Sequence, residues 1–302
     1  MIYSNLCEKI TISNKTVVAI GFFDGIHTAH QSIIKKAVDY AKNNQFQSAV
    51  FTFCNAPTSK QSSKLLLNTN QKNKILLSLG VDFIISPDFN ELKEFSAQAF
   101  IKQILVDKLQ VTHIICGEDF KFGKDRYADT YELKKIAKEN GITFEVCAMI
   151  ANDKEPISAT RIRDFIAVGN IKQANILLGR NYFFSGTVIH GKKLARTIDF
   201  PTINQKIPTE NIVPKYGVYA TKTNIEGMVY PSITNIGVRP TIDGTDLLAE
   251  THIIDFDRDL YDKDITVEMI DFIRIEKKFK CLEELKHQIA QDMVVAKKML
   301  NI

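Results

Sequence analysis

Residues 17–30 read VVAIGFFDGIHTAH, in which an apolar run passes into a loop with glycine and histidine and then into a helical pattern. A near-continuous apolar run of this kind is typical of a strand that is buried on both faces of a parallel sheet. Similar runs follow and alternate with segments that carry apolar residues at helical spacing. Strands are expected at residues 17–23, 48–53, 81–85, 111–116 and 142–147, and helices at 31–44, 71–79, 97–109 and 130–140. The alternation predicts a doubly wound α/β domain.

The second half of the chain has a different pattern. Two short helical segments, 160–168 and 171–178, lead to Gly179, and a series of strands with little helix follows. These strands are expected at residues 182–189, 217–223, 229–235, 249–255 and 265–275, with a helix at 282–299. Such a series predicts an antiparallel barrel or sandwich on which the last helix packs. We therefore predict two domains, residues 1–181 and 182–302, since one core usually stops growing near ~250–300 residues.

The composition is that of an ordinary globular protein, with 45% hydrophobic and 25% charged residues and a net charge of +4. No apolar run approaches the roughly 20 residues that cross a bilayer, and the first residues do not resemble a signal peptide. The five cysteines are scattered and form no C-x-x-C pair, which argues against a disulfide framework or a zinc site. We expect a cytoplasmic protein with small-molecule ligands and with neither nucleic acid nor membrane as a partner. The oligomeric state is left open.

The loop after the first strand is the first candidate site, because ligands bind at the carboxyl ends of strands in doubly wound sheets. His27 and His30 stand three residues apart at the start of a helix, where exposed N–H groups favour phosphate. There they could stabilise charge on a triphosphate attacked at its α-phosphorus. The plainer alternative is that both histidines only cap the helix or lie solvated on the surface.

Two later segments have features that suit the same chemistry. Residues 116–124, CGEDFKFGK, place Gly117 where backbone can approach a ring and Asp119 where it can accept hydrogen bonds. Residues 157–163, ISATRIR, open a helix with hydroxyl caps and two arginines suited to phosphate. The alternatives are a tight turn with aromatic anchors for the first segment and ordinary capping with solvated arginine for the second.

In this order, the three segments resemble the adenylyltransferase half of the bacterial bifunctional riboflavin kinase/FAD synthetase family. That family has the motifs G-x-F-D-G-V-H-x-G-H, G-x-D-F-x-F-G-K and I-S-S-T-x-I-R. The resemblance implies that His27 and His30 contact ATP phosphates, that Asp119 lies at the flavin or nucleotide, and that Ser158, Thr160 and Arg163 close the site. The residues assigned to binding in this half are Gly21, Asp24, Gly117, Asp119, Ser158, Thr160 and Arg163.

This half departs from the family at three positions. Ala29 stands where the family has glycine, and its Cβ would crowd phosphate if the backbone had to approach closely or take a positive φ. Residues 52–57 read TFCNAP, so Ala56 stands where the family has histidine, and Ala159 replaces a serine. One alternative is therefore a riboflavin kinase whose first domain is a degenerate remnant.

The start of the second half holds a candidate nucleotide and metal site. The basic loop with Gly191, Lys192 and Arg196 can wrap ATP phosphates. Thr202 and Asn204, two apart on an extended strand, present their oxygens on one face, and such hard ligands suit Mg²⁺ bound with ATP. The plainer alternative is a Pro-Thr turn followed by an Asn cap.

Glu250 is the candidate catalytic base of the second half. It lies in an alternating strand, and a carboxylate near a primary alcohol can accept its proton during attack on a γ-phosphate. The plainer alternative is an exposed strand glutamate paired with lysine. The surrounding motifs, however, look like a riboflavin kinase from residue 182 to 293. They are Pro201-Thr-x-Asn204, Asn235-x-Gly237-x-Arg239-Pro-Thr, Glu250-Thr-His252, Leu260-Tyr261 and Ile273-Arg274-x-Glu276-Lys-Lys-Phe279.

The resemblance implies a six-stranded barrel in which Thr202 and Asn204 hold Mg–ATP and Glu250 acts on the ribityl 5′-hydroxyl. It also implies that Arg274 lies in a flexible segment over the flavin. Ala195 and Asp199 replace glycines of the family's phosphate loop.

The predicted function is flavin cofactor biosynthesis, in which riboflavin and ATP give FMN, and FMN and ATP give FAD. Besides the riboflavin kinase with a degenerate first domain, the alternative is a flavin-binding regulator without turnover. Thr202, Asn204 and Glu250 argue against the regulator, because a protein that only binds flavin has no need of metal ligands opposite a base.

Overall fold

A computed structural model describes the chain except for residues 7–9, 11, 13, 56–63, 191–199 and 242–243. It divides into two compact units, Met1–Ala159 and Thr160–Ile302. The division falls at the start of α5 (Ala159–Val168), so both helices that precede the barrel pack with it. The domain boundary predicted between residues 181 and 182 stays a prediction.

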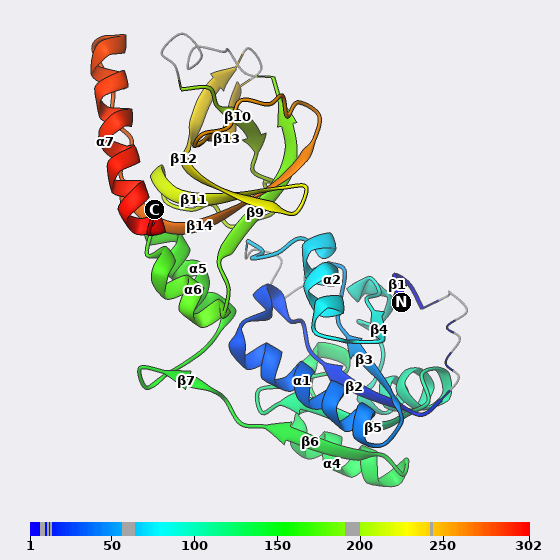
Figure 1. Cartoon of the computed structure of the whole chain (residues 1–302). Helices are drawn as coiled ribbons and strands as arrows, with labels where there is room; N and C mark the ends of the chain where they lie inside the picture. Colours follow the sequence, from blue (N-terminus) through cyan, green and yellow to red (C-terminus); the bar gives the residue numbers. More distant parts are fainter. Residues whose placement is uncertain (7–9, 11, 13, 56–63, 191–199, 242–243) are drawn as a thin grey trace. The chain divides into compact units, whose positions relative to one another are not determined.

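The first unit is built on a six-stranded sheet in the order β1-β4-β3-β2-β5-β6, with every neighbouring pair parallel (Figure 1). Its strands are β1 (Ile2–Tyr3), β2 (Thr16–Ile20), β3 (Gln47–Phe51), β4 (Phe83–Ile85), β5 (Val111–Gly117) and β6 (Thr143–Cys147). The prediction of a doubly wound parallel sheet is confirmed. β1 was not expected, since a two-residue strand is too short to show a periodicity.

Helices cover both faces of this sheet. α1 (Thr28–Asn43) packs against β2, β3 and β5 and buries Ile34, Ala37 and Ala41, which share one helical face. The π-helix η4 (Phe100–Lys108) and α4 (Thr130–Glu139) join an apolar cluster with alternate strand residues such as Val18 and Ile20. α2 (Thr69–Ser78) packs against β4 and the short helix η1 (Asp24–Ile26). The remaining elements are η3 (Phe89–Glu91), α3 (Ala97–Ala99), η5 (Lys124–Arg126) and the hairpin of β7 (Ala151–Asn152) and β8 (Glu155–Pro156).

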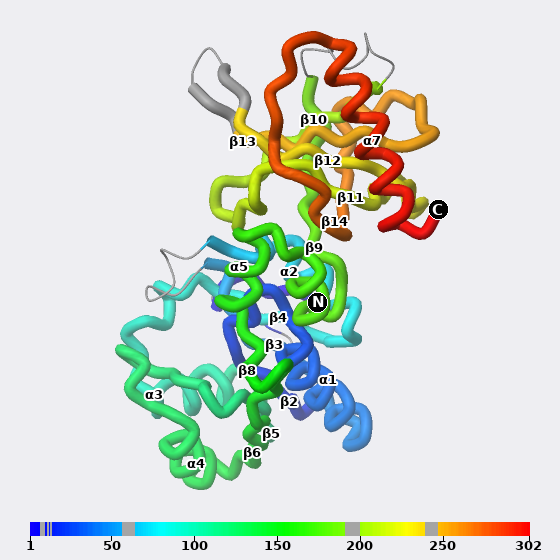
Figure 2. The backbone as a smooth tube through the Cα atoms, turned by 90° about the vertical axis from the view of Figure 1, so that its left-hand side faces the viewer, coloured from blue at the N-terminus to red at the C-terminus, as the bar shows by residue number. Residues whose placement is uncertain are grey.

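The second unit is a closed antiparallel barrel in the order β10-β13-β12-β11-β14-β9, which confirms the predicted six-stranded barrel. The strands are β9 (Tyr182–Ile189), β10 (Ile203–Lys206), β11 (Gly217–Ile225), β12 (Met228–Thr241), β13 (Gly244–Ile253) and β14 (Asp264–Arg274). α6 (Ile171–Leu178) packs against β9 and β14. The terminal helix α7 (Leu282–Leu300) packs against β11, β12 and β14, and Figure 2 shows it running beside the barrel.

Part of the barrel interior is polar but satisfied. The fully buried hydroxyls of Thr223, Ser232, Thr221, Thr234 and Thr251 form a chain in which successive oxygens lie 2.8–2.9 Å apart. Because every member has a partner, the chain carries little of the cost of burying polar groups. It also fixes Thr251 facing inward, and since side chains alternate along a strand, the neighbouring Glu250 faces outward.

Candidate active sites

The loop after β2 makes an unusually tight turn. Phe23, Gly25 and Ile26 have φ values of 52°, 75° and 40°, all in the left-handed region. At Gly25 a side chain is excluded on two grounds, since an added Cβ would also lie 2.5 Å from Leu66 Cδ1. Left-handed backbone at residues other than glycine costs about 1–3 kcal/mol each and persists where the surroundings enforce it. Here Phe23 and Ile26 are buried in the core of the unit.

Gly21 and Asp24 hold this loop in place. The Gly21 N–H donates to the Phe51 carbonyl at the end of β3 (3.1 Å), and the buried Asp24 Oδ1 accepts from the Leu66 N–H (3.0 Å). Both residues therefore fasten the loop to neighbouring segments. The ligand contacts predicted for them stay predictions.

His27 and His30 lie together at the N-terminus of α1. His27 is the N-cap, and its Nδ1 accepts from the His30 N–H (3.4 Å). The two rings stack with centroids 3.5 Å apart, and Phe23 meets the His30 ring edge-on at 5.2 Å. Because the His27 Nδ1 accepts, its ring carries the N–H on Nε2. Capping and pairing thus occur at one place, where an α-helix N-terminus attracts anions.

Ala29 lies in the first turn of α1 with ordinary helical backbone. Alanine therefore adopts the backbone at this position without strain, because the position does not need a positive φ. Of the other departures, Ala56 lies outside the described residues, and its neighbour Asn55 accepts from the Phe89 N–H (2.8 Å).

The Gly117 turn lies next to the histidine loop, because β5 is the sheet neighbour of β2. A Cβ added to Gly117 would lie 2.9 Å from Asp119 Oδ1 and 3.6 Å from Ile33 Cδ1 of α1. The exposed Asp119 is therefore presented beside the first turns of α1. The structure thus brings Gly21, Asp24, His27, His30, Gly117 and Asp119 to one edge of the first unit's sheet.

The segment predicted to close this site spans the division between the two units. Ser158 is half-buried at the end of the first unit. Thr160 and Arg163 belong to α5 in the second unit, where the Arg163 Nη1 donates to Thr160 Oγ1 (3.5 Å). Their closing role stays a prediction.

In the barrel, three polar residues stand in one row on neighbouring strands. Glu250 of β13 lies directly opposite Asn204 of β10 on one side and Asn235 of β12 on the other. Residues directly opposite in an antiparallel pair have Cβ atoms about 4.5–5.5 Å apart and point to the same face. The Glu250 carboxylate is thus flanked by two carboxamides on the outer face of the barrel wall. Asn204 is buried, and Glu250 and Asn235 are half-buried.

A cavity of about 640 Å³ is lined by Ile203 and Thr251, the chain neighbours of Asn204 and Glu250, and not by the three residues of the row themselves. Thr202 and its neighbour Pro201 line it, together with Thr251 of the hydroxyl chain. Its remaining lining comes from β9, β10, β13 and the loop after β13, as Val188, Ile203, Ile253 and residues 256–261. The volume is in the range of sites that hold a cofactor-sized molecule.

The donors at Thr202 and Asn204 fit a magnesium ion that is shared with a nucleotide. A hydroxyl and an amide oxygen are hard ligands, and Glu250 opposite Asn204 adds negative charge. Among the described residues, no three or more His, Cys, Asp or Glu side chains gather as a protein-only metal cage. Such a pair suits Mg²⁺, which keeps water and phosphate oxygens as its other ligands. Gly191, Lys192 and Arg196, predicted to wrap phosphate, lie outside the described residues.

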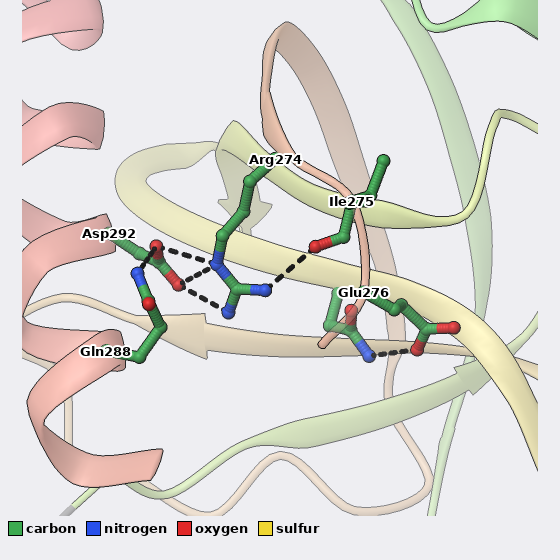
Figure 3. Close-up of polar contacts among 6 residues, drawn as sticks. Arg274, Ile275, Glu276, Gln288 and Asp292 are labelled. Atoms are coloured by element: carbon green, nitrogen blue, oxygen red, sulfur yellow. Dashed lines mark hydrogen bonds and ion pairs between the residues drawn. The ribbon is translucent and has the colours of Figure 1, made fainter. Parts of the chain in front are cut away.

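Arg274 is engaged in an ion pair with α7 (Figure 3). Its Nε and Nη2 donate to both Asp292 carboxylate oxygens at 2.8–3.0 Å, and its Nη1 donates to the Ile275 carbonyl (2.9 Å). Gln288 also donates to Asp292 Oδ1 (3.1 Å). The predicted place of Arg274 over a flavin stays a prediction, and in this structure the side chain clamps the end of β14 to the terminal helix.

Glu276, two residues after Arg274, connects this clamp to the row that contains Glu250. Glu276 accepts from Asn235 Nδ2 (3.2 Å), and Gly237 leaves space for the Glu276 carboxylate. A Cβ on Gly237 would lie 2.7 Å from the Glu276 Cδ, so a larger residue here would require the Glu276 side chain to shift. Sequence reasoning noted Glu276 and Gly237 only as motif letters and missed their contact, since 39 residues separate them (276 − 237).

This combination of folds and sites is typical of two families of transferase. The first unit is an α/β domain with paired histidines at a helix N-terminus, and the second is a closed barrel that has a cavity and a glutamate set between two asparagines. A FAD synthetase family model matches residues 9–161, and a riboflavin kinase family model matches residues 178–300. The chain belongs to the family of bifunctional riboflavin kinases/FMN adenylyltransferases.

Individual relatives agree with this assignment. A Listeria monocytogenes protein named bifunctional riboflavin kinase/FMN adenylyltransferase is 37% identical over 94% of this chain and 92% of its own length. A Pseudomonas fluorescens protein of the same name is 35% identical over 93% of this chain and 92% of its own length. Both domains are present, and the predicted enzyme class, a bifunctional transferase of flavin cofactor biosynthesis, is confirmed at the level of the family.

A solved structure has the same fold. A Streptococcus pneumoniae protein named as a macrolide-efflux protein superposes with a TM-score of 0.87 and 29% identity, and the match covers 98% of each chain. Its name describes that protein, and we take only the fold from it. Within the described part of the present chain, none of the helices has the length and apolar character to cross a membrane.

Proposed function

We propose that this chain converts riboflavin to FMN at the barrel row and FMN to FAD at the histidine loop, with ATP as the donor in both reactions. The observation that carries the proposal is the placement of Glu250 between Asn204 and Asn235, on strands whose neighbouring residues Ile203 and Thr251 line a cavity together with Thr202. A kinase needs positioning and charge stabilisation more than covalent chemistry, and this row supplies a fixed carboxylate for the attacking alcohol.

In the kinase reaction, Glu250 orients the ribityl 5′-hydroxyl and accepts its proton as the oxygen bonds to the γ-phosphorus. The bond from that phosphorus to the β,γ-bridging oxygen breaks, and ADP leaves. The strand ladder keeps Glu250 opposite Asn204 and Asn235, because residues directly opposite on paired strands cannot separate without breaking the ladder. Magnesium bound with ATP, for which Thr202 and Asn204 have the right oxygens, would offset the phosphate charge.

In the adenylyl transfer, a phosphate oxygen of FMN bonds to the α-phosphorus of ATP, and pyrophosphate leaves. The positive end of the α1 dipole and the paired rings of His27 and His30 lie together at this N-terminus. They stabilise the charge that develops on the α-phosphate. The ordinary helical backbone of Ala29 favours an active first domain over a degenerate one.

The test is to incubate the purified full chain with riboflavin, ATP and Mg²⁺ and to separate the flavins by chromatography over time. FMN followed by FAD is the expected result. FMN without FAD would contradict the role of the first unit, and flavin binding without ATP consumption would support the regulator alternative.

A further inference from the structure

Lys72 is a buried lysine beneath the histidine loop. It lies in the first turn of α2, and only 5% of its surface is exposed. Its Nζ donates to the Phe53 carbonyl (2.6 Å) and to Thr52 Oγ1 (3.2 Å), just beyond the end of β3. Lysine is among the residues least often buried, and a buried charge costs free energy unless its contacts repay it. The position therefore needs an explanation other than filling a core.

The contacts of Lys72 extend to Phe22, at the start of the histidine loop. Thr52 Oγ1, which accepts from Lys72, donates in turn to the Phe22 carbonyl (2.8 Å). The ammonium group also lies over the Phe22 ring, 5.1 Å from its centroid, at a distance typical of a cation–π contact. Phe22 is thus held by its ring and by its carbonyl, immediately before the left-handed run that begins at Phe23.

A second contact ties the same helix region to the same loop. The N–H of Leu66, two residues before the N-cap Asn68 of α2, donates to Asp24 Oδ1 (3.0 Å). The loop from Phe22 to His27 is therefore fastened at both Phe22 and Asp24. Its strained φ values need such enforcement, and its last residue is the His27 cap that positions the paired histidines.

We propose that Lys72 is a positioning residue of the adenylyl transfer, whose buried ammonium group holds Phe22 and thereby sets His27 and His30 at the α-phosphate. The proposal rests on the function proposed for the first unit. Lys72 acts through other residues, because it is only 5% exposed and its amine donates to Thr52 and Phe53.

The charge state of Lys72 provides a readout that a merely structural residue would lack. Burial lowers the pKa of Lys72 from 10.5 to about 8, against the opposing effects of Asp24 and, second, of Cys54. β4, which also packs against α2, contributes only Phe and Ile. As pH rises through about 8, the ammonium loses its proton, its hydrogen bonds weaken and its cation–π contact disappears. FAD formation should fall with it.

Fold stability should change in the opposite direction. Between about 8 and 10.5 the unfolded chain keeps the Lys72 proton that the folded chain has lost. The unfolded state then binds more protons, so this group makes folding more favourable as pH rises. A decline of FAD formation above pH 8 that accompanies constant or rising stability of the first unit cannot result from unfolding.

The experiment compares the full-length wild type with Lys72→Met and with Lys74→Met, an exposed lysine of the same helix. FMN and FAD formation are measured from pH 6.5 to 9.5, with thermal unfolding at each pH. Methionine has a similar shape without charge, so Lys72→Met should leave the unfolding temperature unchanged or raised. It should lower kcat for FAD formation roughly 10- to 100-fold, as a small misplacement of catalytic groups does, and spare FMN formation. Lys74→Met should behave as the wild type.

The outcomes separate this proposal from the function on which it rests. A wild type that makes no FAD refutes the proposed adenylyl transfer and the role of Lys72 with it. A wild type that makes FAD, with Lys72→Met folded and within twofold of it at every pH, refutes the role of Lys72 alone. If Lys72→Met does not fold, the wild-type profile decides: a decline of FAD formation near pH 8 without a parallel decline of FMN formation supports the proposal, and a flat profile overturns it.

Discussion

Substituting Arg274 by alanine tests whether the clamp between β14 and α7 stabilises the barrel unit. Asp292 is buried, with a side chain 5% exposed, whereas the Arg274 side chain is 21% exposed. Arg274→Ala therefore leaves a buried carboxylate that keeps only the Gln288 hydrogen bond. Removing one partner of a buried pair costs about 3–5 kcal/mol. Because the arginine side chain is partly exposed to solvent and the Gln288 hydrogen bond remains, we expect a destabilisation at the lower end of this range, about 3 kcal/mol.

This loss should lower the unfolding temperature of the barrel unit by about 6–12 °C, at roughly 2–4 °C per kcal/mol for a unit of this length. Calorimetry of the full chain measures the shift, and hydrogen exchange of α7 peptides shows whether the helix detaches. Asp292→Ala should cost less, since the guanidinium left behind can turn to solvent.

The matched control is Lys263→Ala, which breaks the exposed pair of Lys263 with Glu226 at 2.7 Å, a distance close to that of the clamp. An exposed ion pair contributes little, because water already solvates both charges. If Arg274→Ala shifted the transition no more than Lys263→Ala, the view of Arg274 as a structural clamp would be refuted.

Three further predictions concern the two sites. Glu250→Gln should slow FMN formation about 10²–10⁴-fold with flavin binding retained, as measured by steady-state kinetics and fluorescence titration; normal turnover would remove Glu250 from the mechanism. His30→Ala should abolish FAD formation and spare FMN formation in the chromatographic assay, and loss of both products would show that the activities are coupled or the chain misfolded. Gly25→Ala should destabilise the first unit and lower FAD formation, because its Cβ would lie 2.5 Å from Leu66 Cδ1 at a φ of +75°; a wild-type thermal transition would show that the loop can relax.

Much of the fold could be predicted because it depends on periodicities that are local in sequence. The predicted helix at 171–178 and the strand at 182–189 coincide with α6 and β9. The helix expected at 97–109 begins as the single α-turn of α3 and continues as a π-helix, a difference in hydrogen bonding that apolar spacing does not encode. The strand expected at 229–235 is longer in the structure, where β12 runs from Met228 to Thr241. Its second part, which includes Arg239 and Pro240, has no apolar run that would predict a strand.

The candidate sites were less predictable because they depend on contacts between distant segments. Asn204, Glu250 and Asn235 were all noted, but the register that sets them side by side is a property of the closed barrel. Lys72 was missed because a lysine in a helical segment reads as a solvated residue, and only packing shows that it is buried. The Arg274 clamp needs the position of α7, which no motif supplies.

The closed ladder of the barrel has a consequence for how the kinase site comes into being. A slip of β13 by one residue would turn Glu250 into the hydroxyl-lined interior and Thr251 out to its place, since facing alternates along a strand. Such a slip would also unpair the hydroxyl chain and leave several buried oxygens unsatisfied. A barrel mispaired in this way would therefore be less stable, and the Glu250 carboxylate would no longer lie on its outer face. The fold of the barrel and the outward placement of the Glu250 carboxylate thus depend on the same register, so a barrel with β13 mispaired would lack the proposed base.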